Sequence, residues 1–498
     1  MSIRKSEALK SPKVLFVAAE VAPLAKAGGL GDVAGELPAV IQSMGADIRV
    51  VIPAYLGIEA QTDIIGDFPV AMGSKNETCI VRSVRGAKVP TFLADNYNYF
   101  GRPGIYGHAD DSERFAFFCL AVYQMLLRFD FKPDIIHLND WHTAPLAMLI
   151  RENDREHTQL SSLSILYTIH NMAYQGVCDR RIFGLYGLKE VVFQMDKVEY
   201  YGCFNPMKAG LNYADWINTV SPRYARQILK AEEGFGLEGV LKKRKDRLSG
   251  IINGIDTAFW SPETDPLLYA PYTSESLEGK KTNKAALKEE LGLSPGDKPL
   301  FGMVTRLVNH KGLDILESGI EAILKEGGQF VLLGNGEKYY EYALRRLEER
   351  NPGSVAITLE FNTEKAHRIY AACDMFLMPS KTEPCGIAQL IAMAYGAVPV
   401  VHKTGGLADT VEDYGQAPER GTGFAFSAYT SEAFIRAIRR SLRLYERDRA
   451  GWEALIKRAM ARDSSWKASA AEYLSLYRKL IKNQGKTEEL TAPLKISK

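Results

Sequence analysis

Lys26, Gly28, Gly29 and Asp32 lie in a segment whose composition suits phosphate binding. The apolar run VLFVAAE, which predicts a buried strand, precedes them, and a helix-like pattern follows. Adjacent glycines let backbone N–H groups approach a phosphate, and a helix start adds a positive dipole. The lysine contributes a full positive charge. A tight strand-to-helix turn with a surface lysine is an equally good interpretation of the spacing alone.

Arg306 and Lys311 form a second basic pair. They lie in VTRLVNHKG, directly after another strand-like run and at the start of a helix pattern. Two cations in this position can bind a diphosphate. Solvated surface charges are the ordinary alternative, but a glycine-rich turn at 333–336 moves the interpretation towards function.

Glu383 follows the apolar run DMFLMPS, so it is predicted at the carboxyl edge of a sheet. Open α/β sheets bind ligands at that edge. The carboxylate could accept hydrogen bonds from sugar hydroxyls, and the backbone amides after it could serve phosphate. The alternative is an acid that the helix dipole favours. Thr404 and Gly405 open a loop of the same kind after the next strand.

Two histidine-containing segments also stand at predicted strand ends. His170 ends SILYTIH, where a role as a donor or through its backbone is favoured over a purely structural one. In HLNDWH, Asp140 offers a carboxylate for sugar hydroxyls and Trp141 a ring for stacking. Metal binding needs a third ligand that the sequence does not nominate, so we predict no metal. Asn253, in NGID, is also readable as a turn former.

The elements that must position these residues are short apolar strands between amphipathic helices. Apolar strand runs without alternation predict parallel sheets covered on both faces, which is an α/β fold of doubly wound domains. The predicted division is a first domain at 1–250, a second domain at 251–462, a C-terminal helix at 463–482 and a tail at 483–498.

Composition excludes several classes of function. At 498 residues, 46% hydrophobic and 24% charged, the chain is typical of a globular protein of two or three domains. A net charge of +2 predicts neither a nucleic-acid nor a membrane partner. Six cysteines without a CxxC pair indicate no disulfide framework. The polar start lacks the apolar core of a signal peptide, so we expect a cytoplasmic protein.

In their order along the chain, the motifs KAGGLGD, HLNDWH, HNMAYQG, NGID, TRLVNHKG, TEPCGIAQL and TGGLADTV resemble those of bacterial glycogen synthases, which are related to plant starch synthases. The resemblance extends from Val14 to about Leu480 and is specific because several motifs recur together. It implies the GT-B fold, in which two Rossmann-like domains face each other across a deep cleft. It also implies that ASAAEYLSLYRKL is a helix that returns to the first domain.

The resemblance further implies transfer of glucose from ADP-glucose to the non-reducing 4-OH of an α-1,4-glucan, with retained configuration and no cofactor. Glu383, His170, Lys311 and Arg306 would be the catalytic residues, with Tyr97 and Asp140 on the acceptor side. The donor-site residues would be Lys26, Gly28, Gly29, Asp32, Asn253, Arg306, Lys311, Phe361, Cys385, Gly386, Thr404 and Gly405.

Three positions depart from the family pattern. Ala27 replaces a threonine in the first glycine motif, and Asn139 stands where a histidine usually precedes the aspartate. Phe361 replaces a tyrosine near the adenine, which keeps stacking but loses a phenol hydrogen bond.

Other functions remain open from the sequence. A UDP-glucose-dependent transferase acting on a small sugar acceptor is the main alternative. Many such enzymes carry a second glutamate eight residues after the first, whereas this chain has Ile391 there. An inactive glucan-binding protein would have lost Lys26, Arg306, Lys311 or Glu383, and all four are present. An oxidoreductase would need the GxGxxG that the chain lacks.

Overall fold

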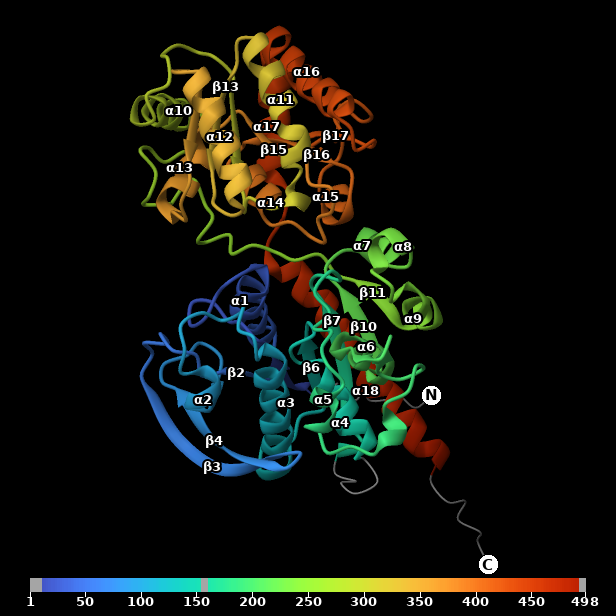
Figure 1. Ribbon diagram of the computed structural model, residues 1–498. Helices are drawn as coiled ribbons and strands as arrows, with labels where there is room; N and C mark the ends of the chain where they lie inside the picture. Colours follow the sequence, from blue (N-terminus) through green and yellow to red (C-terminus); the bar gives the residue numbers. More distant parts are fainter. Residues whose placement is uncertain (1–10, 154–159, 492–498) are drawn as a thin grey trace, which may run out of the picture. The chain divides into compact units, whose positions relative to one another are not determined.

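The computed structural model describes residues 11–153 and 160–491 (Figure 1). The chain forms two compact units. The first contains the chain up to Val220, then Ala225–Ile251, and finally the segment from Ser469 onward. The second contains Ser221–Tyr224 and Ile252–Ala468. The first unit is therefore discontinuous in sequence, because its last helix follows the whole second unit.

A doubly wound sheet is the core of the first unit. Its strand order is β11-β10-β7-β6-β1-β2-β5-β4-β3. The central strands pair in parallel, and the side chains of Val14, Phe16 and Val17 are completely buried. Both faces of these strands are covered, which explains their continuous apolar sequence. The strands are β1 (Lys13–Val17), β2 (Asp47–Pro53), β3 (Thr62–Met72), β4 (Lys75–Val84), β5 (Thr91–Asp95), β6 (Ile135–Asn139), β7 (Ser164–Ile169), β10 (Trp216–Thr219) and β11 (Leu248–Gly250).

One edge of this sheet is antiparallel. Strands β3 and β4 form an antiparallel hairpin, and β4 pairs antiparallel with β5. From Phe68 to Met72 of β3, buried and exposed side chains alternate, as expected for a strand with one solvated face. The small hairpin β8 (Glu199–Tyr200) and β9 (Cys203–Phe204) lies outside the main sheet.

The helices of the first unit connect and cover these strands. Helix α3 buries twelve residues along its length, which makes it a core helix of the unit. Helix α1 begins at Gly29, directly after the predicted glycine loop. The helices before residue 252 are α1 (Gly29–Ser43), α2 (Tyr97–Phe100), α3 (Asp111–Arg128), α4 (Pro145–Glu152), α5 (Arg181–Gly184), α6 (Pro206–Tyr213), α7 (Pro222–Gln227), α8 (Ala231–Gly234) and α9 (Glu238–Lys243).

The C-terminal helix α18 (Trp466–Thr491) packs on the first unit through buried polar contacts as well as apolar ones (Figure 1). The Tyr477 hydroxyl lies 2.8 Å from His137 Nδ1, and Asn218 Nδ2 donates to the Tyr473 hydroxyl. We expected this helix to end at residue 482, but it continues to Thr491, because Gln, Lys and Glu residues favour helix there. Only residues 492–498 of the predicted tail lie outside the described residues.

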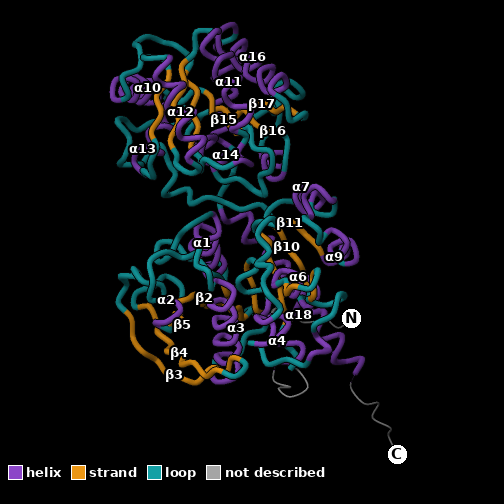
Figure 2. Tube along the Cα trace, viewed as in Figure 1, coloured by secondary structure: helices purple, strands orange, loops and turns teal. Residues whose placement is uncertain are grey.

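The second unit is a smaller doubly wound sheet with the order β14-β13-β12-β15-β16-β17, entirely parallel. Its strands run between helices on both faces (Figure 2). Alternate residues of β12 enter different cores: Phe301 and Met303 pack on one side, and Leu300 packs on the other. The strands are β12 (Leu300–Val304), β13 (Gln329–Leu333), β14 (Val355–Thr358), β15 (Met375–Met378), β16 (Val398–His402) and β17 (Phe424–Phe426).

Helices α11 and α16 pack together on one face of this sheet, and α10 and α13 pack together on the other. The small residue Gly302 of β12 permits the close approach of α13, since a Cβ there would lie 2.2 Å from the Cys373 sulfur. The helices are α10 (Glu278–Glu290), α11 (Leu313–Lys325), α12 (Lys338–Arg350), α13 (Thr363–Ala372), α14 (Ala388–Ala394), α15 (Gly405–Thr410), α16 (Ser431–Arg447) and α17 (Arg449–Ala461).

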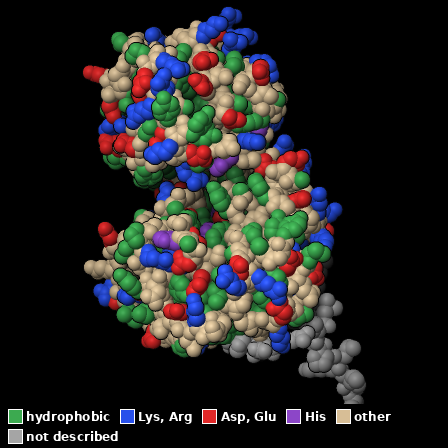
Figure 3. Space-filling model, viewed as in Figure 1, with side chains coloured by type: hydrophobic (Ala, Val, Ile, Leu, Met, Phe, Trp, Pro, Cys, Tyr) green, Lys and Arg blue, Asp and Glu red, His purple; other side chains and the backbone are tan. Residues whose placement is uncertain are grey.

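Surface charge is mixed. Lysine, arginine and acidic side chains are interspersed on the face shown in Figure 3, in keeping with a net charge of +2. Among the helices in the described part of the chain, none combines the length and apolarity needed to cross a bilayer.

Candidate active site

The residues predicted from sequence lie at equivalent places in the two sheets. In the first unit the strand order reverses between β1 and β6, and Lys26 and Asp140 follow these two strands. In the second unit it reverses between β12 and β15, and Lys311 and Glu383 follow those two. Such switch points are where open α/β sheets bind ligands, because the loops diverge there and leave a crevice.

Lys311 and Glu383 form an ion pair at the switch point of the second unit. Lys311 Nζ lies 2.6 Å from Glu383 Oε2, which also accepts a hydrogen bond from the Ser380 hydroxyl. The two side chains are only 17% and 9% exposed. A backbone bond from Lys381 to the His310 carbonyl ties the two loops together. This pair confirms that the loops after β12 and β15 converge, and it fixes the carboxylate and the ammonium in one place.

A cavity of about 160 Å³ opens beside this ion pair. Arg306 lines it and is exposed, so its guanidinium can reach a ligand. Gly312, at φ 79°, opens the following helix in a conformation that favours glycine. A Cβ there would lie 2.1 Å from the Pro379 carbonyl oxygen, so this glycine is also required by the close approach of the β15 loop.

Asn253 lies on the second unit beside the loop after Glu383. A backbone hydrogen bond joins Asn253 to the thiol of Cys385. Burial raises the pKa of this thiol to about 12. Cys385 is therefore a protonated thiol and no nucleophile at neutral pH. The Asn253 side chain is buried, and its Oδ1 has no hydrogen-bond partner within the described residues. A buried acceptor without a protein partner needs an explanation, and a hydrogen bond from a water or from a ligand is one.

The loop at Thr404 and Gly405 packs directly on the Glu383 backbone. The Gly406 N–H donates to the carbonyl oxygens of Glu383 and Pro384, both at 3.1 Å. A Cβ on Gly405 would lie 1.9 Å from the Glu383 carbonyl, so no larger residue fits. The structure thus places the two predicted loops together. Phe361 follows β14, and its ring is 82% exposed.

In the first unit, the glycine loop is organised by a residue that we did not predict, Glu20. Its Oε2 accepts hydrogen bonds from the N–H groups of Ala27 and Gly28 at 2.6 and 2.7 Å, and Oε1 accepts from the Tyr106 hydroxyl. The Gly28 amide, one of the two glycine amides that we expected to face a phosphate, is therefore occupied, and so is the Ala27 amide. Lys26 is paired with Asp32 at 2.6 Å. Helix α1 begins at Gly29, so the positive end of the helix lies within the glycine loop.

His170 is oriented by Asn139, the last residue of β6, and by Asp140, which follows it. Its Nε2 lies 3.0 Å from Asn139 Oδ1, and its backbone N–H donates to Asp140 Oδ1 at 2.7 Å. Burial lowers the pKa of His170 to about 3, so the ring is neutral and donates from Nε2. Burial likewise raises the pKa of Asp140 to about 7, against the opposing effect of the His170 amide. Asn139, which departs from the family pattern, thus holds the histidine.

Asp140 is one of three non-glycine residues with positive φ in the described chain, at 56°. The strained turn aims its carboxylate at the His170 and Asn171 backbone, so one of its oxygens is engaged by protein. The neighbouring Trp141 ring packs over Gly176, where a Cβ would lie 2.1 Å from the ring. Tyr97, predicted on the acceptor side, is exposed at the start of α2.

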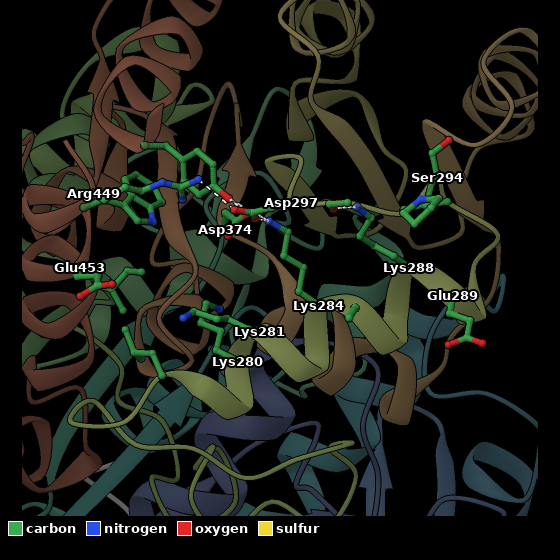
Figure 4. Close-up of a pocket in the computed structure, with 18 of the residues that line it drawn as sticks. Lys280, Lys281, Lys284, Lys288, Glu289, Ser294, Asp297, Asp374, Arg449 and Glu453 are labelled. Carbon is green, nitrogen blue, oxygen red and sulfur yellow. Dashed lines mark hydrogen bonds and ion pairs between the residues drawn. The ribbon is translucent and has the colours of Figure 1, made fainter. Parts of the chain in front are cut away.

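The larger cavity of the second unit, about 960 Å³, contains none of the predicted residues (Figure 4). It lies next to the residues that precede β12 and β15, at the opposite edge from Glu383. Helix α10 presents Lys280, Lys284 and Lys288 to it, and protein groups bind all three. Lys280 donates to two carbonyl oxygens at helix ends, Lys284 pairs with Asp374, and Lys288 donates to the Gly296 carbonyl. These lysines therefore satisfy acceptors of the protein itself, which are carbonyl oxygens and the Asp374 carboxylate.

Sequence reasoning missed Glu20, Tyr106 and Ser380 as residues that organise the site. For Glu20 a signal existed, since a carboxylate that ends an apolar strand run faces the same sheet edge as the glycine loop. Ser380 has an equally simple signal, because it ends the run DMFLMPS three residues before Glu383. For the residues that the structure describes, no group of three or more His, Cys, Asp or Glu side chains is arranged to hold a metal.

Comparison with known proteins agrees with this geometry. A profile described as "Starch synthase catalytic domain" matches residues 13–243, and one described as "Glycosyl transferases group 1" matches 286–455. The chain is 43% identical over 478 residues to a glycogen synthase of Moorella thermoacetica, covering 95% of this chain and 98% of that one. It is also 43% identical over 480 residues to a glycogen synthase of Desulforudis audaxviator, covering 94% and 96%.

Among solved structures, the catalytic domain of starch synthase IV from Arabidopsis thaliana, bound to ADP and acarbose, superposes with a TM-score of 0.88. It is 33% identical and covers 95% of this chain and 100% of that domain. Sucrose-phosphate synthase from Thermosynechococcus elongatus, at 19% identity and a TM-score of 0.62, shares the fold.

Two Rossmann-like units, both matched by glycosyltransferase profiles, define a glycosyltransferase of the GT-B fold. With full-length relatives above 40% identity, the chain belongs to the glycogen synthase family, to which the starch synthase catalytic domain is related.

Proposed function

We propose that this protein transfers glucose from ADP-glucose to the non-reducing 4-OH of an α-1,4-glucan with retention of anomeric configuration. The observation that carries the proposal is the Lys311–Glu383 pair beside a small cavity at the switch point of the second unit. A partly buried cation, a buried carboxylate and an orphaned amide oxygen on Asn253 match the needs of a diphosphate and a sugar. The relative solved with ADP and acarbose supports the same donor and a glucan-like acceptor.

In this proposal Arg306 and Lys311 bind the diphosphate of the donor. Negative charge grows on the leaving diphosphate as the bond to the sugar C1 breaks. Fixed cations stabilise that charge more in the transition state than in the ground state, which accelerates the reaction. Glu383, Ser380 and Asn253 would orient the glucosyl hydroxyls, since they lie at the same sheet edge.

The neutral His170 would act near the reacting sugar as a hydrogen-bonding group, because its low pKa keeps it unprotonated at neutral pH. The acceptor 4-OH attacks the oxocarbenium-like sugar on the face that the phosphate leaves, and a phosphate oxygen takes its proton. No metal enters this mechanism, since Arg306 and Lys311 supply the positive charge. That independence from metal is itself a proposal.

The experiment is transfer of labelled glucose to glycogen from ADP-glucose and from UDP-glucose in parallel, each with and without EDTA. We expect polymer labelling from ADP-glucose that EDTA does not change. Labelling from UDP-glucose alone would overturn the donor assignment, and loss of labelling with EDTA would overturn metal independence. Labelling of a small sugar in place of glycogen would favour the small-acceptor transferase.

A further inference from the structure

Three aromatic residues outside the site described so far form one connected surface feature, here called the aromatic platform: Tyr200, Tyr201 and Phe235. Tyr201 is 88% exposed, and Phe235 is 43% exposed. The Tyr200 and Tyr201 rings meet edge to face with centroids 4.8 Å apart. The Tyr200 hydroxyl donates to the Phe235 carbonyl oxygen at 3.3 Å. Tyr200 therefore contacts both the Tyr201 ring and the backbone of Phe235, which are 34 residues apart in sequence.

The backbone is strained at both exposed rings. Tyr201 has φ 51° and Phe235 has φ 48°, a conformation that costs free energy for bulky side chains. In the described chain the one other non-glycine residue in this region of φ is Asp140, at the candidate active site. The two aromatic residues are thus held in a costly conformation although glycine or asparagine would fit it more easily. Strain that is retained in this way is typical of ligand-binding positions.

Neighbouring contacts hold that conformation. The Gly202 N–H donates to Glu199 Oε1 at 2.6 Å, which closes the turn of the β8–β9 hairpin. Gly236 follows Phe235 with φ 84°, and a Cβ there would lie 2.1 Å from the Tyr200 hydroxyl oxygen. The hairpin and the segment after α8 are therefore packed closely, and these contacts hold the backbone that carries the two rings.

The platform is also bonded to the loop that carries His170. Gln175 Nε2 donates to the Phe235 carbonyl oxygen at 3.0 Å, and Gln175 Oε1 accepts from Asn205 Nδ2 at 2.8 Å. Gln175 lies in the same motif as His170, in HNMAYQG. One carbonyl group, that of Phe235, thus receives hydrogen bonds from both the hairpin and the loop that carries His170.

We propose that the aromatic platform binds the acceptor α-glucan at glucose units removed from the reacting end, an inference that rests on the proposed function. A glucose ring has an apolar C–H face and a polar rim, and tyrosine presents an apolar ring face with a polar tip. Rigid aromatic side chains bind such a ligand at little cost in conformational entropy. The hydrogen bond from Gln175 in the His170 loop to the Phe235 carbonyl favours a glucan over a second copy of this chain as the occupant.

The decisive variant is Tyr201→Asn, because asparagine tolerates positive φ while it removes the ring. The matched control is Tyr339→Ala, which removes another highly exposed tyrosine, from α12 of the second unit. Tyr201→Trp should retain binding. We would measure glycogen affinity by co-sedimentation, and KM and kcat with glycogen and with maltotriose as acceptors.

We expect Tyr201→Asn to weaken glycogen affinity by about 3- to 10-fold, the effect of one lost aromatic contact. KM for glycogen should rise in parallel, with kcat and the kinetics on maltotriose unchanged, and Tyr339→Ala should match wild type. Equal glycogen affinity in wild type and Tyr201→Asn would overturn the proposal. So would a change of oligomeric state in Tyr201→Asn, seen by sedimentation equilibrium, without a change in glycogen binding.

The two proposals fail separately in this design. Co-sedimentation needs no donor, so weakened binding of Tyr201→Asn supports the platform even if wild type transfers no glucose from ADP-glucose. That second result would overturn the donor assignment alone. Thermal unfolding of each variant shows whether the fold is retained, and Tyr201→Asn should be at least as stable as wild type because backbone strain is relieved.

Discussion

The two units have the same switch-point topology, but they satisfy their polar groups differently. In the first unit the Glu20 carboxylate already accepts the N–H groups of Ala27 and Gly28, so the glycine loop is structurally complete. In the second unit the Lys311–Glu383 pair faces a cavity, and Asn253 Oδ1 lacks a partner. One loop is held closed by its own protein, whereas the other leaves hydrogen-bonding capacity for a ligand. Similar sequence signatures can therefore serve organisation in one place and chemistry in another.

The strongest test of this contrast is removal of the ion pair in the second unit. Lys311→Ala and Glu383→Ala should each lower kcat by about 100- to 1,000-fold or more, because each removes a fixed charge at the reacting bond. Steady-state kinetics with ADP-glucose and glycogen measure the loss, and circular dichroism confirms the fold. A folded variant with normal turnover would show that the pair has no catalytic role.

Next is the carboxylate that organises the first unit. Glu20→Gln keeps the shape but removes the charge, so its hydrogen bonds to the loop should lose roughly half their strength. We expect a fall of about 1–3 kcal/mol in the free energy of unfolding and a smaller loss of activity than for Lys311→Ala. Urea unfolding gives the first quantity. Tyr106→Phe, which removes only the third hydrogen bond, is the matched control and should cost less.

Asn253 tests whether its unpartnered oxygen is a ligand contact. Asn253→Ala should leave stability unchanged or slightly improved, because it deletes a buried acceptor that has no partner in the protein. Affinity for the donor should fall by about 5- to 10-fold, the value of one neutral hydrogen bond. Calorimetric titration with ADP-glucose decides the matter. A large loss of stability with unaltered donor binding would assign Asn253 a structural role.

A further effect concerns the pH dependence of Asp140. Its folded-state pKa of about 7 lies above the ordinary value, so the folded state binds the proton more tightly than the unfolded state. The contribution of this carboxyl to the free energy of unfolding is present at low pH and is lost as pH rises through about 7. The loss is up to about 1.4 kcal/mol for each pH unit. His170 acts oppositely below its ordinary pKa, because its folded-state value is about 3.

Comparing wild type with Asp140→Asn isolates the carboxyl contribution. Relative to wild type, Asp140→Asn should gain stability between pH 5 and 7, measured as urea midpoints at each pH. A stability difference that does not vary with pH would show that Asp140 is ionised throughout this range.

Much of the fold was predictable because buried parallel strands are continuous apolar runs, and Gly-rich or charged residues mark where they end. The predicted residues that follow β12 and β15 are brought together for this reason. Glu20 was missed because two of its partners are backbone amides seven and eight residues away, which no side-chain motif records. Its third partner, Tyr106, is 86 positions distant in sequence.

Other features depend on tertiary contacts that a single sequence does not show. Lys280, Lys284 and Lys288 have the spacing of a solvated helix face, yet they are buried because helix-end carbonyls and Asp374 receive them. The strain at Tyr201 is equally invisible in sequence, since nothing in the residue type predicts positive φ. Such positions follow from packing between elements, and their chemistry is readable only after the fold is known.

The return of α18 to the first unit has a consequence for the biosynthesis of the protein. On the ribosome, β1–β11 are complete before Ile252–Ala468 is made, an interval of roughly 10 to 45 s at ordinary elongation rates. Through that interval the His137 and Asn218 side chains lack Tyr477 and Tyr473, the α18 hydroxyls that they contact in the finished protein. The first unit therefore completes its burial only after the second has been synthesised, so the part that is translated first matures last.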